Sequence, residues 1–395
     1  MERLVDQVRA AASGGLRDLA TTLQRRLADR PVRAGVVAAS ADQAGERLAK
    51  LAATVQGDVP ATFDIANGMF AGRAGGRPAI GYLFPGQGAV VATDASVLSR
   101  RFETARELYR TVPVPAAEDA VGTGAAQQRI VASSVAGLRV LSMLGIEASA
   151  AAGHSLGELT ALHWAGAMSE SAVIALSGAH GRMVADIRDG GGAMARIAAP
   201  ADAVEPLLRG EPVVVAGYNS PTQTVVAGPA DAVARVRDAA RAAGLQADRL
   251  PVGDALHSPS MAPAADRLRA HLAAMRFRTL ERSVVSTVTG DVLPPGTDLR
   301  DLLVRQLCEP VRFSQAVTRM ADQVSLLVEV GPGQTLSYLA VQICPGVPFV
   351  SLSTDGASLS GVLSAAAAAY VLGAPVRHDR LLDGANTQSL GLRRA

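Results

Sequence analysis

Cysteine is scarce in this chain, which has two in 395 residues, Cys308 and Cys344. Their spacing matches no metal-ligand motif, and one pair would add little to a core of this size, so a reducing compartment fits best. No apolar run reaches the about 20 residues that cross a bilayer; the longest candidate, 362–372, is short and rich in alanine. The chain opens with charged residues rather than an apolar leader. We therefore expect a cytoplasmic protein without membrane contact.

An excess of charge is also missing, because 38 basic residues balance 36 acidic ones to a net charge of +2. Aromatic residues make up 3% of the chain and are not interleaved with a basic run, so we expect no nucleic-acid partner. Apolar residues reach 49%, mostly alanine, glycine, valine and leucine. Small side chains packed at close range favour a layered α/β architecture.

Strand-like and helical patterns alternate through the main part of the chain. Strand-like runs at 79–84, 148–152 and 325–330 alternate with long helical patterns at 127–144 and 170–187. Alternation of this kind predicts a parallel sheet covered by helices.

Two further units are indicated by changes in the pattern. Between about 196 and 272 the strands are shorter, which predicts a small α+β subdomain inserted into the larger unit. A stretch at 68–78 with four glycines and no periodicity indicates a connector, and the polar end of the chain, 386–395, is expected to be loose. The expected elements are strands at 213–217, 223–227 and 247–252 with a helix at 231–243, and, before residue 76, helices at 16–27 and 42–55 with a strand at 34–39.

A serine at a sharp strand-to-helix turn is the strongest chemical signal. Gly153-His154-Ser155-Leu156-Gly157 is a G-x-S-x-G sequence between an apolar strand pattern and a helical stretch at 158–165. Its glycines permit a tight turn that lifts the Ser155 hydroxyl to the helix N-terminus, where the backbone N–H of Leu156 can face an oxyanion. The motif alone is common by chance, but the strand and helix around it favour a catalytic nucleophile over an ordinary turn.

A serine hydroxyl needs a base, and the chain has six histidines. His257 lies in a loop between a strand pattern and a helix beginning near Ser260, where catalytic groups are usually presented; an ordinary surface histidine is the alternative. His154 adjoins the nucleophile, but neighbouring side chains at a turn point apart, so it packs beneath the turn or lines the pocket. His163 and His180 lie within helical patterns.

Two weaker signals remain. The sequence Phe84-Pro85-Gly86-Gln87-Gly88 closes a strand, and its glycines let backbone N–H groups approach a ligand, so it is a second half of an oxyanion hole or simply a turn. Arg182 lies near apolar neighbours in a helical pattern, where a guanidinium pairs with an anion or extends into solvent.

Together these residues resemble the malonyl-CoA:acyl carrier protein transacylase family, specifically the acyltransferase domains of polyketide synthases. The resemblance covers roughly residues 78–350, and its motifs occur in a specific order. They are Phe84-Pro85-Gly86-Gln87-Gly88, Gly153-His154-Ser155-Leu156-Gly157-Glu158, Gly181-Arg182-Met183, Tyr218-Asn219-Ser220-Pro221, His257-Ser258, Val304-Arg305-Gln306-Leu307 and Val330-Gly331-Pro332-Gly333.

The resemblance implies catalytic roles for matching residues. Ser155 is the nucleophile that becomes acylated, and His257 is its base. Backbone N–H groups of Gln87 and Leu156 stabilise the oxyanion. A backbone carbonyl, which matches that of Gln306, orients the histidine in place of an acid.

The resemblance also implies how the substrate is bound. Arg182 pairs with the malonyl carboxylate, Asn219 matches a position near the active-site histidine, and His154 and Leu256 complete the expected substrate-binding set. The residues 254–257, Asp-Ala-Leu-His, match neither the His-Ala-Phe-His of malonyl-selective domains nor the Tyr-Ala-Ser-His of methylmalonyl-selective ones.

Two leucines bear on the choice of extender unit. Leu256 is large and apolar like the phenylalanine of the malonyl pattern, and Leu156 is also typical of malonyl domains. Malonyl is therefore favoured, methylmalonyl is the alternative, and an iterative enediyne-type synthase fits so atypical a sequence.

The fold implied by the resemblance is α/β. An α/β-hydrolase-like large subdomain with a parallel sheet carries an inserted ferredoxin-like α+β subdomain and follows a small linker domain. The expected boundaries are a ketosynthase-to-acyltransferase linker at 1–76, the large subdomain at 77–200 and 273–352, the small subdomain at 201–272, and a post-acyltransferase segment at 353–395.

The function implied is transfer of an acyl group from a coenzyme A thioester to the phosphopantetheine thiol of an acyl carrier protein, beside a neighbouring ketosynthase domain and without metal or redox cofactor. A serine esterase or thioesterase is the first alternative; it needs an acid for the histidine, and Asp231 or Asp254 is available. A non-catalytic docking domain is the second alternative, and it would not need the pair of Ser155 and His257.

Overall fold

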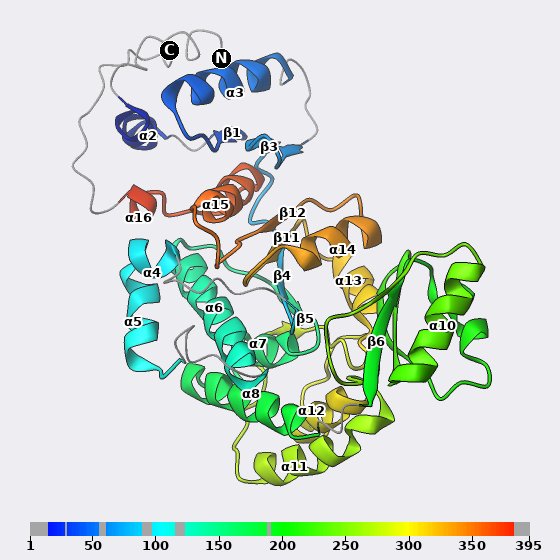
Figure 1. Ribbon diagram of the computed structural model, residues 1–395. Helices are drawn as coiled ribbons and strands as arrows, with labels where there is room; N and C mark the ends of the chain where they lie inside the picture. The colour runs from blue at the N-terminus through cyan, green and yellow to red at the C-terminus, as the bar shows by residue number, and fades with distance from the viewer. Residues whose placement is uncertain are drawn as a thin grey trace.

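The computed structural model describes residues 15–27, 30–54, 61–88, 97–114, 123–187 and 191–382. The central layer of these residues is a five-stranded sheet in the order β10-β5-β4-β11-β12, in which neighbouring strands are parallel (Figure 1). The predicted α/β fold with a parallel sheet is thus confirmed. The strands are β4 (Ile80–Phe84), β5 (Ala150–Gly153), β10 (Ser283–Val284), β11 (Leu326–Glu329) and β12 (Phe349–Ser351).

Helices cover both faces of this sheet. Because successive side chains of a strand point to opposite faces, Tyr82 and Phe84 of β4 pack into one apolar cluster and Leu83 into the other. The first cluster includes residues of α6, α7 and α8, and the second includes residues of α13 and α14. A strand buried on both faces reads as a continuous apolar run, which explains the pattern at 79–84. These helices are α6 (Thr123–Met143), α7 (Gly157–Trp164), α8 (Glu170–Ala185), α13 (Phe313–Ala321) and α14 (Thr335–Ile343).

Further helices extend the first face. α11 packs on both α8 and α12, so it belongs with the large sheet although the expected boundary at 272 left it mostly in the small subdomain. These elements are α4 (Val97–Arg101), α5 (Glu103–Thr111), the short 3-10 turn η3 (Pro259–Met261), α11 (Ala262–Ala273) and α12 (Leu299–Cys308).

The inserted unit has its own antiparallel sheet in the order β7-β8-β6-β9. Taken in chain order its elements run β-α-β-β-α-β, which is the ferredoxin-like arrangement. The sheet begins with β6, ahead of the expected boundary at 201. Its elements are β6 (Gly192–Ile197), α9 (Ala201–Val204), η2 (Glu205–Leu208), β7 (Val214–Ser220), β8 (Gln223–Pro229), α10 (Ala230–Ala242) and β9 (Ala247–Arg249).

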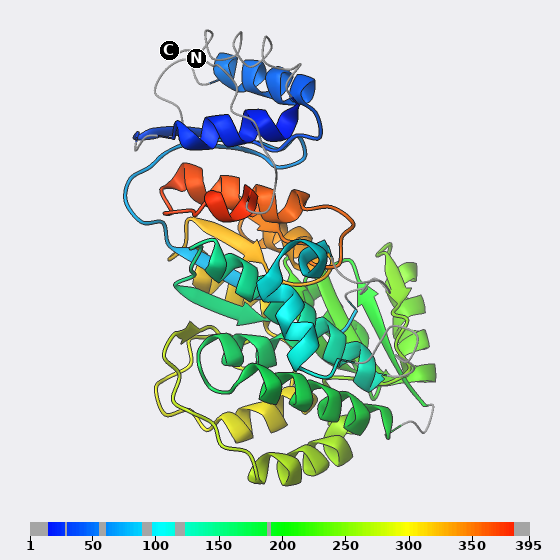
Figure 2. The same ribbon diagram turned by 90° about the vertical axis from the view of Figure 1, so that its left-hand side faces the viewer.

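The N-terminal part forms a third sheet, β1-β3-β2, and Figure 2 shows α15 lying between this layer and the five-stranded sheet. The connector expected at 68–78 is wrong over its first half, because β3 occupies five of its eleven residues. Gly72 of β3 lies so close to α15 that an added Cβ would be 2.8 Å from the carbonyl oxygen of Val371, so glycine here permits packing rather than flexibility. These elements are α2 (Leu16–Arg25), β1 (Val32–Val36), α3 (Ala41–Thr54), β2 (Thr62–Asp64), β3 (Met69–Arg73), α15 (Ser360–Leu372) and α16 (Asp379–Leu382).

The assignment of the first 76 residues as an interdomain linker stays a prediction, as does that of 353–395 as a post-acyltransferase segment. The expected loose end at 386–395 lies outside the described residues.

Candidate active site

The nucleophile turn is built by close backbone approach. A Cβ added to Gly153 would lie 2.1 Å from the backbone carbon of Gly157, and one added to Gly157 would lie 2.1 Å from the carbonyl oxygen of Phe84. Only glycine therefore fits at either position. Between them Ser155 has a φ of 52°, the left-handed conformation that a strained strand-to-helix turn imposes on its nucleophile.

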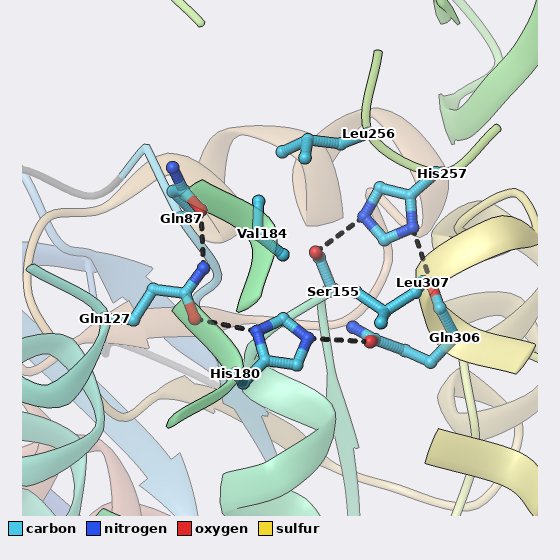
Figure 3. A pocket seen from close by; sticks show the side chains of 9 residues that line it. All are labelled: Gln87, Gln127, Ser155, His180, Val184, Leu256, His257, Gln306 and Leu307. Atoms are coloured by element: carbon cyan, nitrogen blue, oxygen red, sulfur yellow. Dashed lines mark hydrogen bonds between the residues drawn. The ribbon is translucent and has the colours of Figure 1, made fainter. Parts of the chain in front are cut away.

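The base contacts this serine directly. Ser155 Oγ lies 2.7 Å from Nε2 of His257, and Nδ1 of His257 lies 2.9 Å from the backbone carbonyl oxygen of Gln306 (Figure 3). A carbonyl oxygen can only accept, so Nδ1 carries the proton in the neutral ring and Nε2 is free to accept from the serine hydroxyl. This tautomer is the one that general-base catalysis requires.

Local hydrogen bonds hold the loop that presents His257. His257 has a φ of 57°, and the next residue, Ser258, donates through Oγ to the carbonyl of Ala255 at 2.6 Å and accepts from the N–H of Ser260 at 3.3 Å. Ser258 thereby caps η3. The loop is fixed by its own residues, so the base is held in place before substrate binds.

Burial controls the protonation of His257. Removal from water lowers the pKa of His257 from 6.5 to about 4, with the nearby His154 acting in the same direction and the hydrogen bond to Gln306 opposing them. At neutral pH the ring is uncharged and can accept the serine proton.

The oxyanion side of the site is formed by the loop after β4. A Cβ added to Gly86 would lie 2.4 Å from the carbonyl oxygen of His154, so this loop lies directly against the nucleophile turn. Leu156 immediately precedes α7, where backbone N–H groups point out of the helix. Use of the Gln87 and Leu156 N–H groups by an oxyanion stays a prediction.

A chain of side-chain amides and a second histidine continues into the pocket. Gln127 Nε2 donates to Oε1 of Gln87 at 2.7 Å, Gln127 Oε1 lies 2.8 Å from Nδ1 of His180, and Nε2 of His180 lies 3.4 Å from Oε1 of Gln306 (Figure 3). The full lining comprises Gln87, Gln127, Ser155, His180, Val184, Leu256, His257, Gln306 and Leu307.

Two of these residues, Gln127 and His180, were not expected in the site. α8 is apolar on most of its surface, so no amphipathic pattern distinguished a pocket-facing side of the helix. The only signal was that His180 and Val184 are four residues apart and thus share one face.

Three expected substrate-binding residues do not line the pocket. His154 Nε2 lies 2.9 Å from Oδ1 of Asn219, whose Nδ2 donates to Gln223 at 3.0 Å, so this pair ties the nucleophile turn to the small subdomain. Arg182 is exposed on α8, about 200° around the helix from the face of His180, because each residue turns the helix by about 100°. Leu256 does reach the pocket.

The buried carboxyl group of Glu158 stabilises the nucleophile turn through hydrogen bonds. Oε2 of Glu158 accepts from the N–H and the hydroxyl of Thr287, both at 3.1 Å, and the same hydroxyl lies 2.7 Å from the carbonyl of Gly153. Burial raises the pKa of Glu158 to about 7. Glu158 was recognised only as part of the motif; its tethering of β5 to the segment after β10 depends on the tertiary structure.

Metal-ligand clusters and membrane spans are both absent from the part of the chain that the structure describes. No three or more His, Cys, Asp or Glu side chains gather there in a way that could hold a metal ion. Within the same ranges, no helix combines the length and apolar character needed to cross a membrane.

The pH dependence of Ser155 reactivity tests the state of His257. With an uncharged fluorophosphonate probe, we expect the labelling rate to stay constant down to about pH 5 and to fall about tenfold per pH unit below about pH 4, where the base is protonated. A midpoint near the ordinary 6.5 would contradict the buried, neutral base.

Circular dichroism at each pH provides the control for unfolding in this experiment. Buried neutral histidines bind protons more readily in the unfolded chain, so stability falls as pH drops below about 6.5. Labelling rates are compared only where the signal of the folded protein persists.

A parallel sheet with a G-x-S-x-G turn, a serine bonded to a neutral histidine, and a carbonyl as the orienting group define an enzyme that forms an acyl-serine intermediate. The sequence also matches the model of the acyl transferase domain family over residues 82–343. The chain belongs to this family.

Known relatives agree with this membership. The chain is 33% identical over 337 residues to polyketide synthase GfsB of Streptomyces halstedii, covering 78% of this chain but 6% of that protein. It is 36% identical over 283 residues to the malonyl CoA-acyl carrier protein transacylase of Escherichia coli K12, covering 66% of this chain and 92% of the relative. The acyltransferase domain of an iterative polyketide synthase in enediyne biosynthesis superposes with a TM-score of 0.83 at 36% identity, covering 97% of this chain and 95% of that one.

Proposed function

We propose that the chain transfers a malonyl unit from malonyl-CoA, through an ester on Ser155, to the phosphopantetheine thiol of an acyl carrier protein in polyketide biosynthesis. The observation that carries the proposal is the 2.7 Å contact between Ser155 Oγ and His257 Nε2 in a member of the acyl transferase family. One relative is a malonyl CoA-acyl carrier protein transacylase. This similarity supports malonyl-CoA as the acyl donor and an acyl carrier protein as the acceptor.

The first half-reaction loads the serine. His257 Nε2 takes the hydroxyl proton as Ser155 Oγ attacks the thioester carbonyl carbon, and N–H groups of Gln87 and Leu156 stabilise the oxyanion. The carbon–sulfur bond then breaks, and the imidazolium returns its proton to the departing coenzyme A thiolate.

The second half-reaction runs the same steps with a new thiol. His257 removes the proton of the carrier's phosphopantetheine thiol, the sulfur attacks the ester carbonyl, and the proton finally returns to Ser155 Oγ. Both steps exchange one acyl acceptor for another without changing oxidation state. The mechanism therefore requires no redox cofactor, and the residues of the site perform it without a metal.

The orienting group argues against the hydrolase alternative. Hydrolases of this kind use a carboxylate to orient the histidine, whereas Nδ1 of His257 meets the Gln306 carbonyl. Asp231 instead forms an exposed ion pair with Arg235 on the same helix, α10. A docking domain would have no need of a paired serine and neutral histidine.

The setting in a larger synthase is part of the proposal. The chain spans 6% of the length of GfsB, so it corresponds to one acyltransferase segment of such a protein. We propose that residues 1–76 link it to a neighbouring ketosynthase and that the whole acts in the cytoplasm. Leu256 in the pocket supports malonyl over the bulkier methylmalonyl unit.

Mass spectrometry of the intact protein tests the proposed function. After brief exposure to a mixture of malonyl-CoA, methylmalonyl-CoA and acetyl-CoA, we expect the mass of a malonyl adduct, and its loss when a carrier protein bearing phosphopantetheine is added. Release of the adduct into water at the same rate with or without carrier would support the esterase alternative. Absence of both adduct and fluorophosphonate labelling would support the docking domain.

A further inference from the structure

The pocket beside Ser155 has no group with a fixed positive charge among its described lining residues. Its polar side chains are three glutamines, the serine and two histidines, and none of the described residues that line it is lysine or arginine. A carboxylate removed from water needs a charged partner or several N–H donors. A dicarboxylic acyl group would therefore have to be recognised by one of the groups already present.

His257 is committed to Ser155, which leaves His180. Its ring is buried, with 6% of its surface exposed, and lies on the face of α8 that meets the pocket (Figure 3). Both ring nitrogens face amide oxygens, Nδ1 that of Gln127 at 2.8 Å and Nε2 that of Gln306 at 3.4 Å. A neutral imidazole has one N–H, but an imidazolium has two and could donate to both.

The contact of His180 Nε2 with Gln306, at 3.4 Å, is longer and weaker than that of Nδ1 with Gln127. It is the contact that an incoming anion would displace. The amide of Gln306 would then be free to turn its N–H donors toward the same anion. Burial lowers the pKa of His180 to about 4, so the ring is neutral in the empty pocket at pH 7. A carboxylate at hydrogen-bond distance acts in the opposite direction and favours the protonated ring.

Arg182 does not supply the missing charge. Its side chain runs along the other side of α8, where its Nη1 would lie 3.3 Å from a Cβ added to Gly178, on the same side as the amide of Gln128. Gln128 does not line the pocket, whereas its neighbour Gln127 does. The Arg182 guanidinium, which lies on the side of Gln128, therefore lies away from the pocket.

We propose that His180, rather than Arg182, binds the free carboxylate of the malonyl group and takes up a proton from solvent as it does so. The inference rests on the proposed function and names the residue that determines its substrate class. Because the ring must be protonated to pair with the anion, recognition of malonyl weakens as pH rises through the pKa of His180 in the complex. Recognition of an uncharged acyl group has no such dependence.

Among the described residues, the titratable groups of the helices packed against α8 do not line the pocket as His180 does. His257 is the second histidine of the described lining. As the general base it is expected to affect malonyl and acetyl loading equally. The remaining titratable side chains on α6, α7 and α11, the helices packed against α8, lie outside the pocket lining: Arg129, Arg139, Glu158, His163, Asp266, Arg267, Arg269 and His271.

The test compares malonyl and acetyl loading of Ser155 by intact mass between pH 6 and pH 9. For the native chain we expect the malonyl-to-acetyl rate ratio to fall with rising pH. We expect His180→Ala to lower malonyl loading about 30-fold, the scale of a charge-assisted hydrogen bond, with acetyl loading changed less than about threefold and the ratio independent of pH. His180→Arg should restore malonyl loading and also remove the pH dependence.

Arg182→Ala is the matched control on the same helix, and it should leave the ratio unchanged. His180→Gln, which keeps a hydrogen-bonding side chain at this position but cannot be protonated, should behave like alanine. Its fluorophosphonate labelling reports correct folding. Equal losses for both thioesters, or a selective malonyl loss in Arg182→Ala alone, would overturn the assignment while malonyl transfer itself stands. A native chain that loads acetyl but no malonyl at any pH would instead refute the malonyl proposal and with it the role of His180.

Discussion

Replacement of Ser155 by alanine is expected to abolish covalent loading, with a decrease of more than about a thousandfold, because no other group in the turn can form the ester. Only one oxygen atom is lost, from a side chain that is not fully buried, so the fold should persist. The measurement is the intact mass after exposure to malonyl-CoA. A persisting acyl adduct on this variant would place the nucleophile elsewhere.

Ser155→Gly is the informative companion variant. It also lacks the hydroxyl, but glycine adopts the φ of 52° without strain, so its melting temperature should equal or exceed that of the alanine variant. If both variants fail to load while both remain folded, the loss is chemical rather than structural.

Replacement of His257 by alanine should slow acylation and transfer to the carrier thiol by at least about a hundredfold each, the usual contribution of a positioned base. Both half-reactions are affected because the same Nε2 accepts the serine proton and, later, the proton of the incoming thiol. Rapid-quench measurement of each step separately gives the two rates.

His271→Ala provides the control for this experiment, since His271 is exposed on α11. It should react at the native rate in both steps. A defect of His257→Ala confined to one half-reaction would contradict the shared base.

Local sequence patterns were sufficient to predict an element wherever a single segment contains all the residues that determine it. The strand at 79–84 could be predicted because a strand covered on both faces must be apolar throughout. The glycine-rich stretch at 68–78 was misinterpreted, since glycine is needed both in flexible connectors and where a helix packs tightly on a strand. The close approach of Val371 to Gly72 joins residues about 300 positions apart, and no local pattern contains it.

The two positions on α8 illustrate the same limit within the site. Arg182 and His180 are separated by one residue, and the resemblance assigned the carboxylate to the arginine through the motif Gly181-Arg182-Met183. Which of them faces the pocket depends on how α8 is rotated against α6, and packing determines that rotation.

By itself the sequence determined the layered α/β fold, the inserted subdomain and the tight turn that carries Ser155, the predicted nucleophile. Each of these follows from short-range constraints: apolar periodicity, and a turn so tight that only glycine fits at Gly153 and Gly157. The tertiary structure alone decided the meeting of Gln127, His180 and Gln306, and it provided the contact of His257 Nδ1 with the Gln306 carbonyl that the resemblance had implied. These three residues come from α6, α8 and α12, and their contacts depend on distances between separate helices, which long-range packing sets and local sequence does not encode.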